Sequence, residues 1–398
     1  LEAAARVIVI LSDDASLHTA LKTEPLVAVL VYILEKSNGW ILECVMHAFT
    51  NLARHRAFRV DLIEKGCIPA IVHALISGKV TSMIVAEEVC RCLCLLSYES
   101  SKVEVMITHG HILVVLYSLY KGKLCNPFCA HMMVVILRNL SYGNIVDSKE
   151  GENAEQTRSA GIAGCAPEPP SPGFIEAEDP RGNAALQQAS ISTRDEPSKS
   201  AVTACTCIVQ QECFRLLGWL LYDYGQENPQ LLKSVCVTLH NVSKVTSLHA
   251  QLVEQGFAAV AFKVAVAHVD AFGDCDDDES VTSEGNQDGS STRLSMFDVF
   301  HLTNAVRLIS QTSSIRRKLV TSKIIKVLSS LLTELTELSR HQIVWALTQL
   351  ASSKECRKVL VEEKTIDLII RLSHHAETTE TQEQCSSALS SLSEHASV

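Results

Sequence analysis

One helix ending recurs along this sequence at a nearly fixed interval. The segments "HAFTNLA", "CLCLLS" and "VTLHNVS" each stand thirteen residues before a glycine, at Gly66, Gly110 and Gly256. The full series of endings is Ser12, Ala53, Ser97, Ser141, Ser243, Ser310, Ala351 and Ser393. Successive intervals are 41, 44, 44, 102, 67, 41 and 42 residues. A sequence that repeats in this way predicts an array of similar units, each too small to bury its apolar face alone.

The two long intervals contain polar insertions. Residues 144–203 hold six of the ten prolines, and residues 271–293 are acidic and rich in serine and glycine. Neither stretch can bury much apolar surface, so we expect both to be disordered. Removing them restores intervals of 42 and 44 residues. The predicted organisation is therefore repeats in 1–143, 204–270 and 294–398, separated by insertions 144–203 and 271–293.

Each unit has the pattern of three helices. In "AFRVDLIEKGCIPAIVHALIS" a short helix ends at Gly66 and a second begins near Pro69, as expected for a left-handed residue at a helix end and a proline in a first turn. A longer third helix follows, and its apolar positions cover most of its circumference. Where Glu24, Lys323 or Lys364 replaces the glycine, we expect the corner to be made differently.

The motifs resemble those of the armadillo repeat. They are Gly66-Cys67-Ile68-Pro69-Ala70-Ile71-Val72, the endings Asn51-Leu52-Ala53, Asn139-Leu140-Ser141 and Asn241-Val242-Ser243, and "WALTQLA" from Trp345 to Ala351. HEAT repeats, which have a similar length, are the competing interpretation. The resemblance implies an all-α fold, a right-handed α-solenoid of about seven to eight three-helix repeats. It also implies that the third helices line a concave groove.

In the armadillo family, the third helix carries an inward ladder of Trp and Asn. The corresponding positions lie six and two residues before each ending, and a further polar position lies ten before it. The predicted protein-binding residues are Glu43, His47, Asn51, Glu87, Arg91, Asn139, Asn241, Asn304, Trp345 and Gln349. Only one repeat keeps the Trp, which disfavours an importin-type receptor. Two alternatives stay open: the asparagines bind a partner's backbone, or they act locally at helix ends. The pairs Glu2–Arg6 and Glu87–Arg91 are likewise either groove residues or solvated intrahelical pairs.

Composition excludes several classes of function. The formal charge of −10 disfavours nonspecific nucleic-acid binding, and no apolar run approaches the length of a membrane span. The fifteen cysteines form no Cys-x-x-Cys pair, so we expect reduced thiols in the cytoplasm, with a partial metal site at Cys125, Cys129 and His131 as a minor alternative. Asp274, Asp276 and Asp278 begin like a calcium loop, but Glu279 and Gly285 occupy the positions that need glycine and a bidentate acid. Leu1 is not methionine, so we expect the chain to be a piece of a longer protein.

No motif of an enzyme is present, and we expect neither catalytic residues nor a cofactor or metal. The prediction is a non-enzymatic interaction scaffold that binds other proteins within a larger complex. Its first form is a structural component of a cytoskeletal or microtubule-based assembly such as a ciliary axoneme. The alternative is a soluble adaptor that binds extended peptides in its groove for transport or signalling.

Overall fold

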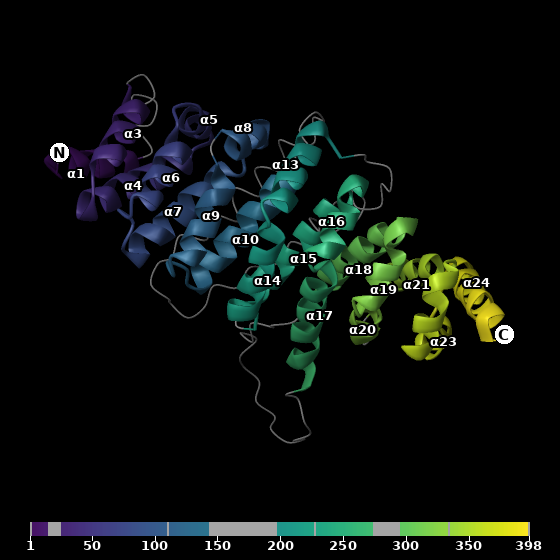
Figure 1. The fold of residues 1–398 in the computed structure, drawn as a ribbon. Helices are drawn as coiled ribbons and strands as arrows, with labels where there is room; N and C mark the ends of the chain where they lie inside the picture. Colours follow the sequence, from purple (N-terminus) through teal and green to yellow (C-terminus); the bar gives the residue numbers. More distant parts are fainter. Residues whose placement is uncertain are drawn as a thin grey trace, which may run out of the picture.

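A computed structural model gives the architecture of the chain, and it describes residues 2–14, 25–109, 111–142, 197–226, 228–273, 295–332 and 335–396. All secondary structure in these ranges is helical. The helices form an elongated array with α1 at one end and α24 at the other (Figure 1). The protein is thus an all-α solenoid, as the repeat period predicts.

The unit is a trio of helices with a fixed order. In the best-defined example, α5 (Arg56–Glu64) and α6 (Cys67–Ile76) form a short bent pair, and α7 (Met83–Leu96) follows as the long third helix. These are the three segments that the sequence predicts. The described residues hold six such units, from α5 to α24, preceded by the pair α3–α4 and by α1.

The helices fall into three rows by their place in the unit. The first-helix row is α5, α8 (Val103–Thr108), α13 (Lys199–Gln210), α16 (His249–Glu254), α19 (Arg316–Thr321) and α22 (Lys354–Glu362); short 3₁₀ turns, Ser100–Lys102, Thr246–Leu248 and Ser313–Ile315, precede α8, α16 and α19. The second-helix row is α3 (Leu26–Lys36), α6, α9 (Ile112–Lys121), α14 (Cys213–Tyr224), α17 (Phe257–Gly273), α20 (Ile324–Ser330) and α23 (Thr365–His374). The third-helix row is α1 (Glu2–Asp13), α4 (Gly39–Ala53), α7, α10 (Pro127–Tyr142), α15 (Pro229–Ser243), α18 (Met296–Ser310), α21 (Glu337–Ala351) and α24 (Thr379–Ala396).

Successive third helices pack side by side, including α10 against α15 across the first long interval. The buried apolar side chains form one continuous core along the array. Because each third helix from α4 to α21 lies between two others, most of its surface is buried, and only a narrow stripe can reach solvent.

The corner between first and second helices is made in the same way in every described unit. Gly66 has φ of 85°, and no heavy atom lies within 4 Å of the place that a Cβ would take, so backbone conformation alone favours glycine there. Lys323 (φ 68°) and Lys364 (φ 57°) adopt the same left-handed conformation. The prediction of a different corner at these lysines was wrong: the helix–helix geometry of the repeat imposes the conformation on whichever residue stands there.

The limits predicted for the insertions need correction where the structure describes them. The helix α13 begins at Lys199, because Ser198 caps it by accepting a hydrogen bond from the backbone N–H of Ala201, so residues 199–203 belong to a repeat. The helix α17 extends to Gly273, three residues past the predicted boundary. Residues 144–196 and 274–293, which include Asp274, Asp276 and Asp278, lie outside the described residues.

A recurring arginine at the start of the unit was missed. Arg59, Arg316 and Arg357 each donate from Nε to the carbonyl of the residue that ends the preceding third helix, over 2.8–2.9 Å. A cation suits these carbonyls because they form the negative end of the helix dipole. The sequence signal was present, since each arginine stands six residues after an ending.

Candidate protein-interaction surface

The positions ten and six residues before each ending form the stripe that the third helices leave open, which we call the third-helix face. Half-buried side chains occupy it over most of the array: Glu43, His47, Glu87, Arg91, His131, Lys233, Val237, His341 and Trp345. Glu383 and Ser387 are exposed at the C-terminal end, whereas Val135, Phe300 and Asn304 are buried. The register read from the sequence therefore places its charged residues on one solvent-facing stripe, with Asn304 as the predicted site residue that lies beneath it.

Three of the four predicted asparagines bond the preceding repeat. Nδ2 of Asn51 donates to Ser12 Oγ (3.4 Å), Asn139 to Ser97 Oγ (2.9 Å) and Asn241 to Ser141 Oγ (3.2 Å). Each serine hydroxyl in turn donates to a carbonyl three residues earlier in its own helix. Asn51 and Asn241 are only 2% and 6% exposed, so their donors are engaged inside the array. The geometry favours a local role at the helix ends over backbone capture.

The two other predicted amides are also engaged. Gln349 Oε1 accepts from Arg316 Nη2 at 2.9 Å, and Asn304 Oδ1 accepts from Arg307 Nε at 2.8 Å. Asn304 Nδ2 lies 3.3 Å from His240 Nε2, a neighbour from the preceding third helix. Of these contacts, the one with His240 joins two adjacent repeats.

A charged network joins α4 and α7 within the third-helix face. Arg91 Nη1 bonds Glu88 Oε1 at 2.6 Å, and His47 Nδ1 lies 3.5 Å from the same oxygen. Arg91 also pairs with Glu87 at 3.5 Å. The hydrogen bond to Glu88 raises the pKa of His47. Burial tends to raise the pKa of Glu88, but hydrogen bonds led by that of His47 lower it below its ordinary value.

Glu88 itself was not among the predicted residues. It is 7% exposed, and its Oε2 is buried without a hydrogen-bond partner, as are Asn51 Oδ1 and Arg91 Nε. A buried polar atom without a hydrogen-bond partner is costly. The sequence signal was the register of the repeat. The residue nine before an ending lies next to the residue three before the previous ending: Thr50 Oγ1 donates to the carbonyl oxygen of Glu88, and Thr348 Oγ1 donates to that of Gln384.

Cations stack on aromatic rings between neighbouring third helices. Arg6 lies 4.8 Å from the Trp40 ring and Arg91 lies 4.7 Å from the Phe128 ring. In both cases the arginine is six residues before an ending and the ring is thirteen before the next, so the same contact occurs at two junctions of the array. Trp40 and Phe128 were not predicted as site residues, although they share this offset.

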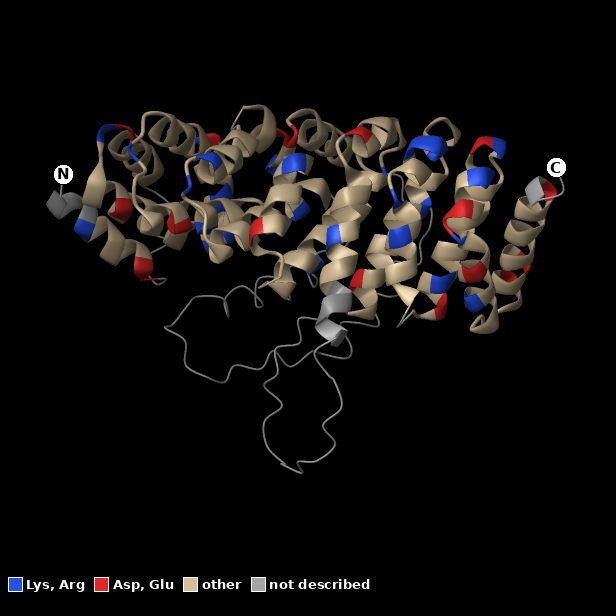
Figure 2. Cartoon of the chain, turned by 60° about the horizontal axis from the view of Figure 1, so that its bottom comes forward, with Lys and Arg blue, Asp and Glu red and all other residues tan. Residues whose placement is uncertain are grey.

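The described residues offer no clustered chemistry of a metal centre. Among the described residues, no group of three histidine, cysteine or acidic side chains is placed so that it could hold a metal ion. Cys125, Cys129 and His131 therefore do not form such a group. Basic and acidic residues alternate along the array without separating into two poles (Figure 2). No single helix in these ranges is long and apolar enough to cross a membrane.

Comparison with known proteins finds likeness in structure only. No protein-family model matches the sequence, and no curated protein matches it either. An engineered protein from a structural genomics programme is similar over 98% of this chain and 84% of its own, with 18% identity and a TM-score of 0.43. A designed armadillo repeat protein in complex with the peptide (KR)4 is similar over 82% of this chain and 99% of its own, with 16% identity and a TM-score of 0.42. A structure from a study of a phosphorylation switch between cadherin and β-catenin is similar over 98% of this chain and 90% of its own, with 12% identity and a TM-score of 0.31.

Proposed function

We propose that this chain is a non-enzymatic protein-interaction scaffold that binds a folded partner along its third-helix face. The carrying observation is the extent of that face: charged, polar or aromatic side chains stay half-exposed on α4, α7, α10, α15 and α21, although Phe300 and Asn304 are buried at the corresponding positions of α18. Core packing requires no such stripe. Repeat arrays bind along extended surfaces, with affinity spread over several units.

The engaged amides favour a folded partner over an extended peptide. A peptide held by its backbone needs free donors and acceptors, whereas the donors of Asn51, Asn139 and Asn241 already bond serines. A folded partner can instead meet the side chains of the stripe. We therefore propose a structural role in a cytoplasmic, microtubule-based assembly such as a ciliary axoneme. The second candidate is the soluble adaptor, which the acidic side chains of Glu43 and Glu87 would suit if its peptides were basic.

Co-sedimentation tests the proposal. The wild-type chain should pellet with polymerised tubulin or with a purified axonemal fraction. A variant that combines Glu43→Lys, Lys233→Glu and Trp345→Ala changes only half-buried residues of the third-helix face, and it should bind at least about tenfold more weakly, since interfacial charges and aromatic side chains often contribute more than 1.4 kcal/mol. The matched control combines Lys326→Glu, Asp367→Lys and Ile370→Ala on the exposed side of α20 and α23.

Each outcome has a distinct meaning. Loss of binding in the first variant and not in the control supports the third-helix face. Equal binding by wild type and both variants would show that the binding site lies outside the third-helix face. A wild-type chain that stays in the supernatant but binds a basic peptide of alternating lysine and arginine would make the adaptor the right function. Microscopy of the tagged full-length protein tests the location independently.

A further inference from the structure

The second-helix row carries an aromatic cluster that the third-helix face does not use. Tyr117 and Tyr120 of α9 meet Trp219 of α14, with ring centroids 6.1 and 5.6 Å apart. One turn along α14, Tyr222 is 79% exposed. The chain has only seven tyrosines and three tryptophans, so this surface is strongly enriched in them. Tyrosine and tryptophan are the residues that most often dominate protein interfaces.

Two lysines lie on these rings. Lys121 Nζ is 4.9 Å from the Trp219 ring centroid, and Lys263 Nζ is 4.8 Å from that of Tyr222. Lys263 also donates to the carbonyl oxygen of Gly218 at 3.0 Å. Among the described residues neither lysine pairs with a carboxylate. Stacking on a ring leaves the charge of a lysine intact, so both remain available to an anion.

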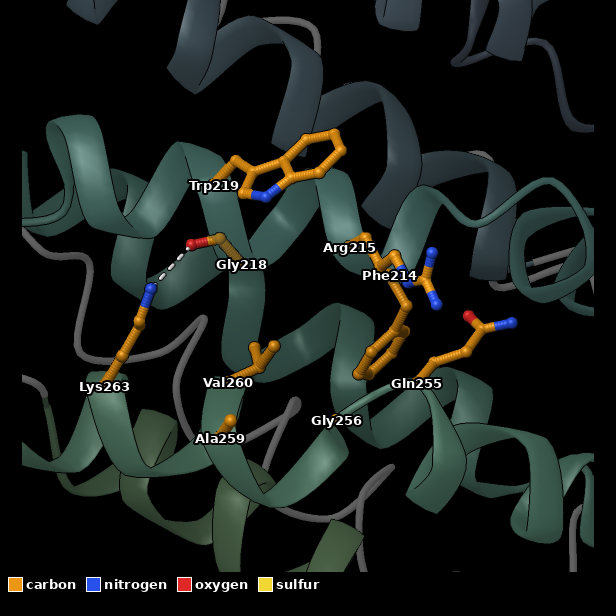
Figure 3. A pocket seen from close by; sticks show the side chains of 9 residues that line it. All are labelled: Phe214, Arg215, Gly218, Trp219, Gln255, Gly256, Ala259, Val260 and Lys263. Carbon is orange, nitrogen blue, oxygen red and sulfur yellow. Dashed lines mark hydrogen bonds between the residues drawn. The ribbon is translucent and has the colours of Figure 1, made fainter.

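A pocket of about 200 Å³ opens beside Lys263, between α14 and α17, and Trp219, on which Lys121 stacks, also lines it. Figure 3 shows Phe214, Ala259 and Val260 lining it, with Lys263 and Arg215 on opposite sides. Gly218 and Gly256 contribute no side chains, which leaves the space open. Arg215 is already paired with Glu212 at 3.0 Å. Gln255, also in the lining, donates to the carbonyl oxygen of Val209, and its Oε1 has no hydrogen-bond partner.

The dimensions and charge of this site define what fits it. Small-molecule and cofactor pockets span about 300–1,000 Å³, so this one suits a single side chain. Its apolar wall suits an apolar side chain, and the two lysines suit carboxylates that lie beside this side chain. We propose that the α9–α14–α17 surface binds an acidic peptide segment of a partner protein, with one phenylalanine or leucine in the pocket and acidic residues on Lys121 and Lys263. This site is separate from the third-helix face, so the array would bind two partners on different rows of helices.

Fluorescence anisotropy tests this proposal on the full chain. The probe is a labelled nine-residue peptide with a central Phe and four Asp or Glu on each side. The control peptides replace Phe by Ala, or the acids by Lys. The protein variants are Lys121→Glu with Lys263→Glu, and Ala259→Leu, which fills the pocket from an exposed lining position. The matched control is Lys326→Glu, an exposed lysine on the second helix α20.

The acidic Phe peptide should bind wild type and Lys326→Glu equally, and at least about tenfold more weakly to both site variants. Both control peptides should bind at least about tenfold more weakly to wild type. Equal binding of the acidic Phe and Ala peptides would show attraction by charge alone and overturn the proposal. Capture of phosphatidylserine vesicles without peptide binding would replace it with a membrane surface. Circular dichroism identifies any variant that has unfolded, and the third-helix variants should leave peptide binding unchanged.

Discussion

Single residues in this array adopt the conformation that their place in the repeat demands. Residues of very different type stand at the same left-handed corner, namely Gly66, His111, Glu212, Gly256, Lys323 and Lys364, with φ between 55° and 94°. A side chain in this conformation costs roughly 1–2 kcal/mol through contact of Cβ with the backbone. The chain is therefore less stable with lysine at positions 323 and 364 than it would be with a residue that adopts this conformation without strain.

Replacing Lys364 by glycine should raise the free energy of unfolding by about 0.5–1 kcal/mol. The gain is the relief of Cβ strain less the greater entropy that glycine has in the unfolded chain. The matched control is Lys358→Gly in the middle of α22, where the same change should cost about 1 kcal/mol. Urea denaturation measures both, and a loss of stability at Lys364 would contradict the strain argument.

A buried histidine pair gives the chain a sensitivity to acid. His240 of α15 and His301 of α18 are 5% and 9% exposed, and their Nδ1 atoms lie 2.6 Å apart. Burial lowers the pKa of His301 to about 4. Burial, followed by the charge that His301 would carry, also lowers the pKa of His240. Both rings are therefore neutral at pH 7.

The stability that this pair contributes should be present above pH 6.5, the ordinary pKa of the unfolded histidine, and should be lost as the pH falls from 6.5 towards 4. Replacing both by glutamine should reduce the fall in unfolding free energy between pH 7 and pH 5 by about 2 kcal/mol or more. His375→Gln, an exposed change at the end of α23, is the control. An unchanged pH dependence in the double variant would exclude the pair as its source.

At the scale of helices, asparagine–serine bonds are rungs that join successive third helices. The junction between α4 and α7 lacks this bond, because Leu95 stands at the asparagine position and Ala53 at the serine position, and both are buried. An Asn there would face no hydroxyl, and a buried amide without a partner is costly. The rungs therefore belong to the packing of the array.

A double-mutant cycle on Asn139 and Ser97 measures one rung. Each single change to alanine should lower the unfolding free energy by about 1 kcal/mol, because a partly buried hydrogen bond is lost. The double variant should cost less than the sum of the two, with a coupling of about 0.5–1 kcal/mol. Strict additivity would mean that the 2.9 Å bond contributes nothing to stability.

The sequence predicts helices well here because their signals are local. Apolar spacing, the glycine at residue 66 and the proline at residue 69 lie within one unit, and α5, α6 and α7 follow them closely. The partners of the predicted site residues are not local: Asn51 meets Ser12, 39 residues away. Whether an amide on a third helix faces solvent or its neighbour depends on the spacing of packed helices, which no single unit contains. The stripe could be predicted because it follows from the register within each unit. Glu88 was missed because its burial depends on the neighbouring helix.

The molecule as a whole is a linear assembly in which each repeat contacts mainly its neighbours. Although the apolar core is continuous from Val27 to Leu392, its contacts join adjacent units. The stability of such an array is approximately a sum of unit and junction contributions, so a weakened junction can open while distant units stay folded. A single-core domain of this size would instead transmit the weakening to most of its slowly exchanging amides.

Hydrogen exchange under native conditions distinguishes these cases in a chain carrying Asn139→Ala and Ser97→Ala. The altered junction joins α7 and α10, so amide exchange should accelerate in these two helices and in α9, which packs in the same unit. Exchange in α21 and α24, several repeats away, should match that of the wild type, because their own junctions are intact. The acceleration should correspond to the loss of stability in the double-mutant cycle, about fivefold or more for each kcal/mol. A uniform acceleration from α4 to α24 would mean that the array opens as one cooperative unit. Loss of one asparagine–serine bond would then destabilise the α9–α14–α17 surface and the third-helix face alike.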